Sequence, residues 1–236
     1  MIINLGDAPF KAFITVTYLA DKCTVSLGDK TFTHNGGGKH TFTVNKKGTW
    51  TIAAISNKGA TETKTVSITY NGQIANISMA CALFANGAWQ NPSITGGWEA
   101  STVRFTYVSG QNSGVAPTVS INNGTAIIRV TQGNGHSGSY STKNKINLTD
   151  YSKLVLTGSM PDNHHVQVTY CGIAFVSQKT EFLQSYAVAK KMFSHLETFN
   201  NTTIINVSGI TGSYYLTIGI YADQCPLNIT NMRLEP

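Results

Sequence analysis

Aromatic side chains are the residues of this chain best suited to binding chemistry, because flat rings stack on the apolar faces of sugars while nearby polar groups bond the hydroxyls. The second half contains Trp89, Trp98, Tyr107, Tyr140, Tyr151, Tyr214, Tyr215 and Tyr221. Each tyrosine also fits a place in the core or at its rim, and Tyr214 and Tyr215, as neighbours in a strand, must point to opposite faces. Trp98 follows two glycines and is expected to be a structural plug.

From these residues we predict one carbohydrate-binding site. It would consist of Trp89, His136, Tyr140, and whichever of Asp162 and His164 faces the same end of the domain. His136 and Tyr140 are assigned to a glycine-rich surface loop, where side chains are accessible to a ligand.

That loop, Gly133–Gly138, matches the pattern G-x-G-x-x-G of dinucleotide-binding turns. The residues that follow it, Ser139 to Lys145, carry no apolar helical stripe, so the helix that would face a pyrophosphate is missing. His164 and the next histidine are adjacent and would point to opposite faces of a strand, which argues against a shared metal ion. We therefore expect no cofactor and no histidine metal site, while a structural calcium ion stays open.

Hydrolytic chemistry finds little support in the sequence. A glycosidase needs two carboxylates roughly 5–10 Å apart across a sugar, but Asp150 and Asp162 both read as turn formers whose side chains bond local backbone. No G-x-S-x-G nucleophile elbow occurs. The chain is therefore expected not to be an enzyme.

The elements that must position these residues are strands. In Thr65–Tyr70 the apolar side chains alternate with polar ones, which places them on one face of a half-buried strand. Turn sequences such as Asn35–Gly38, Asn71–Gly72 and Asn123–Gly124 recur at the spacing of sandwiches and barrels. The predicted fold class is all-β.

Strand positions divide the chain into three parts. Residues 1–80 are predicted to form an immunoglobulin-like sandwich with Trp50 on the inner face. Its seven expected strands are 13–19, 23–27, 30–33, 39–44, 49–55, 62–70 and 74–79. Residues 81–92 are predicted to be a linker, and residues 93–236 to be a jelly roll. Its expected strands include 103–108, and the stretch 181–193 fits strand and helix about equally, with strand favoured. The other expected strands of this part are 118–121, 125–131, 154–159, 165–175, 186–193, 203–207, 214–222 and 227–234.

Composition restricts the partners. Only 12% of the residues are charged and the net charge is +6, without the dense Lys/Arg stripe of a nucleic-acid binder. No apolar run is long enough for a membrane helix, and no secretory signal is recognised at the N-terminus. Cys23, Cys81, Cys171 and Cys225 are expected to be buried hydrophobes, although a Cys171–Cys225 disulfide stays open.

Two groups of motifs resemble a known family. Val25–Thr33, Gly48–Ile52 and Val66–Tyr70 resemble the immunoglobulin-like domains of tail proteins from phages and prophages of gut Firmicutes. A second group of motifs resembles the galactose-binding-like jelly rolls, akin to carbohydrate-binding modules, that follow these domains. Its members are Thr95–Trp98, Ile146–Leu154 and Val207–Gly219.

The resemblance implies a virion protein, made in the host cytoplasm, that acts as a tail or baseplate adhesin and binds carbohydrate on the host cell surface. Its partners would be that glycan and other virion proteins, with no nucleic acid and no membrane insertion, and homotrimers are the habit of such fibres. One alternative is a capsid or tail decoration protein that binds no glycan. The other is an accessory or catalytic fragment of a glycoside hydrolase.

Overall fold

The computed structural model describes residues 9–18, 22–35, 38–56, 61–105, 113–131, 136–160, 171–180, 182–193, 199–221 and 226–236. The chain divides into two compact units, Met1–Ala80 and Cys81–Pro236. Strands make up almost all of the regular structure in both, which confirms the all-β prediction. No helix among the described residues is long and apolar enough to cross a membrane.

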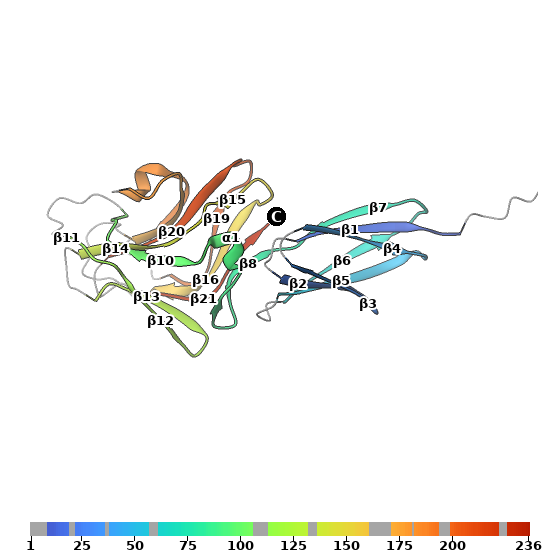
Figure 1. The fold of residues 1–236 in the computed structure, drawn as a ribbon, viewed down its shortest axis with the longest axis horizontal. Helices are drawn as coiled ribbons and strands as arrows, with labels where there is room; N and C mark the ends of the chain where they lie inside the picture. Colours follow the sequence, from blue (N-terminus) through green and yellow to red (C-terminus); the bar gives the residue numbers. More distant parts are fainter. Residues whose placement is uncertain are drawn as a thin grey trace, which may run out of the picture. The chain divides into compact units, whose positions relative to one another are not determined.

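The first unit is a sandwich of two sheets. Its strands are β1 (Ala12–Tyr18), β2 (Lys22–Leu27), β3 (Lys30–Asn35), β4 (Gly38–Val44), β5 (Gly48–Ser56), β6 (Thr61–Ile68) and β7 (Ile74–Ser78). One sheet has the order β4-β1-β7 and the other the order β3-β2-β5-β6; in Figure 1, β1, β4 and β7 lie along one side of this unit and β2, β3 and β5 along the other. All seven expected strands are present, with ends shifted by one or two residues.

The core of this unit follows from strict alternation along its strands. In β1 every second residue is buried, including Ile14, Val16 and Tyr18. In β5, Ile52 is buried and Trp50 packs against the same core, so the predicted inner face of that strand is confirmed. Period-two patterning is thus enough to orient these strands.

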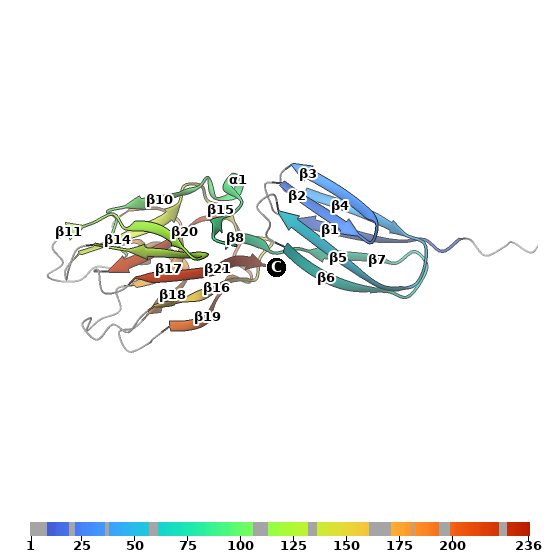
Figure 2. The ribbon, with the colours of Figure 1, turned by 90° about the horizontal axis from the view of Figure 1, so that it is seen from below.

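The second unit contains two larger sheets, seen as two layers in Figures 1 and 2. The β14 sheet has the order β10-β14-β20-β17-β18, with β11 paired to β14 and β15 to β20; the β21 sheet has the order β12-β13-β21-β16-β19, with β8 and β9 attached through β21. The elements are β8 (Cys81–Ala85), β9 (Ala88–Trp89), α1 (Pro92–Thr95), β10 (Trp98–Ser101), β11 (Ser113–Gly114), β12 (Thr118–Asn122), β13 (Thr125–Arg129), β14 (His136–Thr142), β15 (Ile146–Asn147), β16 (Lys153–Met160), β17 (Cys171–Val176), the 3₁₀ helix η1 (Leu183–Tyr186), β18 (Ala187–Phe193), β19 (Phe199–Asn206), β20 (Ser213–Tyr221) and β21 (Leu227–Glu235).

The segment 81–92 is not a linker. Its first residues form β8, which pairs with the C-terminal strand β21 through Cys81 and Leu234, and Leu83 and Phe84 are fully buried. The following Asn91 donates from Nδ2 to the carbonyl of Ala82 at 2.7 Å. A short apolar run can therefore be mistaken for a connection when its strand partner lies about 150 residues away, at the other end of the unit.

The second half of the predicted glycine-rich loop 133–138 differs from the prediction, while residues 133–135 lie outside the described residues. His136, Ser137 and Gly138 belong to β14, inside a sheet, and Ser137 and Ser139 are buried. The small residues are needed because other chain segments lie close: a Cβ on Gly138 would come within 1.9 Å of the carbonyl oxygen of Val115. Glycine and serine here allow close packing rather than a surface loop.

Two smaller expectations are corrected as well. Residues 103–105 of the expected strand 103–108 are not in a strand, and 106–112 lie outside the described residues. The ambiguous stretch 181–193 contains both alternatives, since η1 occupies Leu183–Tyr186 and β18 occupies Ala187–Phe193. The buried cysteines are Cys23, Cys81 and Cys171, whereas Cys225 lies outside the described residues.

Candidate functional site

Trp89 and Tyr140, the two aromatic residues of the predicted site, lie in a three-ring cluster with Trp98, the expected structural plug. Trp98 pairs with Thr142 across β10 and β14, two residues from Tyr140, so both rings lie on the same face of the sheet. Their centroids are 5.3 Å apart in a stacked arrangement, and Trp89 lies 4.6 Å from Trp98 and 5.4 Å from Tyr140. Trp89 also makes an edge contact with the buried Phe84.

This cluster has the character of core more than of a binding platform. The three side chains are partly buried, and burial raises the pKa of Tyr140 to about 12, so its hydroxyl stays protonated at neutral pH. Within the described part of the chain, the indole Nε1 of Trp98 is buried and has no hydrogen-bond partner. Because the rings pack on one another, much of their stacking surface is already covered.

Of the three remaining predicted site residues, the structure describes His136 alone. His136 lies on the same strand as Tyr140, but four residues away, which corresponds to roughly 13 Å along an extended chain. Asp162 and His164 lie outside the described residues. Trp89 and Tyr140 are thus in ring contact, and the role of all five predicted residues in sugar binding stays a prediction.

The opposite face of the β14 sheet is organised differently. One row of cross-strand partners on it runs through Glu99, Ser141, Thr217 and Ala174, and the hydroxyls of Ser141 and Thr217 lie 2.7 Å apart. The next row contains Ser139, Gly219 and Gly172. We call this surface the serine face.

Phe105 covers the glycine part of the serine face. It is fully buried in a second small core with Ala174, Val176 and Leu183, and a Cβ on Gly219 would lie 2.3 Å from its Cβ. Backbone hydrogen bonds from Leu183 to Arg104 and from Gln184 to Phe105 hold this cover in place. Ser141, Thr217 and Ala174 are buried as well, so the first row reaches solvent at Glu99, at its end.

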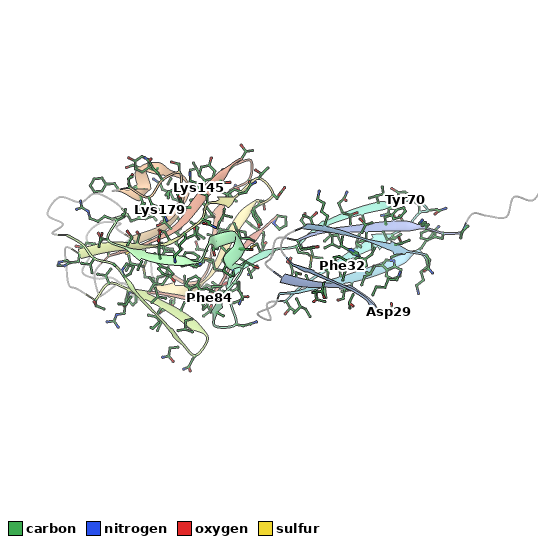
Figure 3. The ribbon with its side chains drawn as sticks, in the orientation of Figure 1. Asp29, Phe32, Tyr70, Phe84, Lys145 and Lys179 are labelled. Atoms are coloured by element: carbon green, nitrogen blue, oxygen red, sulfur yellow. The ribbon has the colours of Figure 1, made fainter. Side chains whose placement is uncertain are left out.

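At that end four side chains meet in what we call the Tyr215 platform: Tyr215, Lys145, Lys179 and Glu99. The ammonium groups of Lys179 and Lys145 lie 4.4 and 5.4 Å from the centroid of the partly buried Tyr215 ring. Lys179 also forms an ion pair with Glu99 and donates to the carbonyl of Thr142 at 3.2 Å. Figure 3 labels both lysines in the second unit.

The backbone fixes where these side chains start. Tyr215 lies in β20 opposite Val176 of β17, and its neighbour Tyr214 points to the other face and donates to the carbonyl of Thr211 at 3.1 Å. Lys145 follows a turn that is tied to the end of α1, because the amide of Asn144 donates to Thr95 at 2.7 Å. The predicted division of the tyrosine pair between two faces is consistent with this arrangement.

The platform can offer an aromatic face, ammonium donors and a carboxylate acceptor to one ligand. The Glu99 side chain is 43% exposed and that of Lys179 is 23% exposed, so both can reach solvent. These are the groups with which a protein surface binds a polyhydroxylated ring.

Another carboxylate of the second unit, Glu235, is engaged separately. Glu235 accepts from Lys153 at 3.0 Å and from Arg233 at 2.7 Å. Burial alone would raise the pKa of Glu235, but hydrogen bonds from these two cations outweigh burial and lower it. Among the residues that the structure describes, no group of three His, Cys, Asp or Glu side chains is placed to hold a metal ion.

Tyr215 is one of the aromatic residues noted in the sequence, but it is not among the predicted sugar-binding residues. Lys145, Lys179 and Glu99 are not among them either. These residues are 36 to 80 positions apart from their contacts in the chain. No local spacing signals such a group, because it depends on which strands become neighbours.

Comparisons with known proteins return structures but no family. No family model and no curated protein matches the chain. One similar solved structure comes from work on the promiscuous specificity of carbohydrate-binding modules of the β-sandwich superfamily, at 10% identity and a TM-score of 0.31, covering 97% of this chain and 98% of that one.

Two further structures match at similar levels. One contains CBM51-2, in complex with GlcNAc, and INT domains of Clostridium perfringens ZmpB, at 12% identity and a TM-score of 0.27, covering 97% of this chain and 48% of that one. The other is SGBP-B of the Bacteroides ovatus mixed-linkage glucan utilization locus in complex with a mixed-linkage heptasaccharide. It matches at 9% identity and a TM-score of 0.24, covering 98% of this chain and 53% of that one. TM-scores this low support no conclusion about the site of this chain.

Proposed function

We propose that this chain is a non-catalytic carbohydrate-binding protein whose second unit recognises glycans at the Tyr215 platform. The observation that carries the proposal is the half-buried Tyr215 ring beside the ion pair of Lys179 with Glu99. A ring fixed in a strand keeps a rigid flat face, and a charged pair at its edge supplies both donors and acceptors to sugar hydroxyls.

Further, we propose that the protein belongs to a bacteriophage particle, as a tail or baseplate adhesin. The support is the resemblance of its motifs to phage and prophage tail proteins, together with a surface rich in Ser, Thr and Asn and poor in charge. Detection of the protein in purified virions by mass spectrometry, with tail genes beside its own gene, tests this location. Capsid genes as neighbours would favour the decoration role instead.

The binding role is tested on a glycan array with the full chain and two matched variants. Tyr215→Ala removes the platform ring, whereas Tyr214→Ala removes its neighbour on the opposite face. We expect at least about a tenfold loss of affinity for Tyr215→Ala, as a stacked ring contributes on the order of 1.4 kcal/mol, and less than twofold for Tyr214→Ala. Equal losses would argue against the platform, provided that both variants melt like the parent protein.

The cluster of Trp89, Trp98 and Tyr140 is tested in the same array. If Trp89→Ala weakens glycan binding without lowering the melting temperature, the binding site lies at this cluster and not at the Tyr215 platform. Release of sugar by the chain from host cell wall would instead support the hydrolase alternative.

A further inference from the structure

The two lysines of the Tyr215 platform are engaged to different degrees. Lys179 has three described partners: the Glu99 carboxylate, the carbonyl of Thr142 and the Tyr215 ring. Lys145 contacts the same ring from 5.4 Å and, within the described residues, has no carboxylate partner. The charge of Lys179 is therefore compensated by Glu99, while the charge of Lys145 is not.

The surroundings of Lys145 strengthen this imbalance. It is exposed and follows Lys143 and Asn144 in the turn between β14 and β15, where Lys143 is exposed too. The turn is held by backbone hydrogen bonds from Lys143 to Gly97 and from Asn144 to Thr95. A lysine with no carboxylate partner among the described residues thus extends from a turn held by its backbone and lies beside an aromatic ring.

We propose that the Tyr215 platform selects acidic glycans, with Lys145 as the residue that contacts the carboxylate, sulfate or phosphate group; this rests on the proposed carbohydrate-binding function. A sugar ring bound at Tyr215 places its substituents next to the Lys145 ammonium group. A charge-assisted hydrogen bond there is stronger than one to a neutral hydroxyl, and Lys145 gives up only a weak exposed contact with the ring to form it. Glu99 keeps Lys179 in position and disfavours a second anionic group, so one acidic substituent per bound unit suits the site.

Two pairs of polymers that differ only in charge test the selection: polygalacturonate against its methyl ester, and dextran sulfate against dextran. Binding of the full chain is measured by calorimetry at low and moderate salt. We expect the charged member of a pair to bind about five- to tenfold more tightly, and the difference to shrink as salt is raised.

Variants separate this proposal from the function on which it rests. Lys145→Gln should lower the affinity for the charged polymer to that for the neutral one and so remove the preference, while Lys190→Gln, an equal change of charge at an exposed residue of β18, should preserve it. Tyr215→Ala should weaken both members of the pair. Equal binding of charged and neutral polymers overturns the selectivity and leaves carbohydrate binding standing, whereas binding of none of the four overturns both proposals.

Discussion

Replacing Phe105 by alanine tests whether the serine face is closed as the structure has it. The side chain is fully buried, and burying a phenylalanine contributes about 1.5–3 kcal/mol. The floor beneath it consists of Gly172 and Gly219, which have no side chains that could move into the space. A remaining cavity on the order of 80–100 Å³ adds roughly 2 kcal/mol, so we expect a total loss of about 3.5–5 kcal/mol.

Guanidinium unfolding followed by tryptophan fluorescence measures this loss. The chain has three tryptophans, and a Trp50→Phe background leaves only Trp89 and Trp98, which report on the second unit. Ile121→Ala is the matched control, because that side chain is 49% exposed and its removal should cost less than about 0.5 kcal/mol. A Phe105→Ala loss below about 1 kcal/mol would show that Phe105 does not cover the sheet.

Three further predictions concern single side chains. Gly219→Ala should unfold at lower denaturant than the parent, because its new Cβ would collide with the side chain above it, and an unchanged midpoint would contradict the close approach. Burial raises the pKa of Tyr140 to about 12, so the protonated hydroxyl contributes fully to folding stability below pH 10. This contribution, roughly 2–3 kcal/mol, is lost as the pH rises toward 12. Thermal melts at increasing pH should therefore show a smaller alkaline loss of stability for Tyr140→Phe than for the parent protein. The lowered pKa of Glu235 stabilises the fold above the pKa of the unfolded chain and is lost on acidification, so urea midpoints of Glu235→Gln should fall less between pH 7 and 3 than those of the parent.

The corrected elements show where local patterns lose their meaning. In β1 and β5 one face is apolar and the other polar, and the expected strands appear within one or two residues of their predicted ends. In β14 the alternation is hidden, because Ser137, Ser139 and Ser141 are polar yet buried. These residues are covered by segments that come from elsewhere in the chain, which no window along the sequence can anticipate.

The same limit applies to the binding residues. Trp89 and Tyr140, both selected as site residues from the sequence, are in contact. Their rings pack against each other, which covers part of the surface on which a sugar would stack. The Tyr215 ring packs against the small core around Phe105. It becomes a candidate only through Lys145 and Lys179, which approach it from two different loops.

Local patterns are sufficient to predict the all-β class and the positions of most strands, because side-chain alternation and turn residues act over a few positions and need no distant partner. The tertiary structure alone decided which strands became neighbours: it joined β8 to β21, closed part of the serine face with Phe105 and assembled the Tyr215 platform. Those outcomes depend on long-range pairing and on the packing of one segment over another, and neither leaves a regular spacing along the chain.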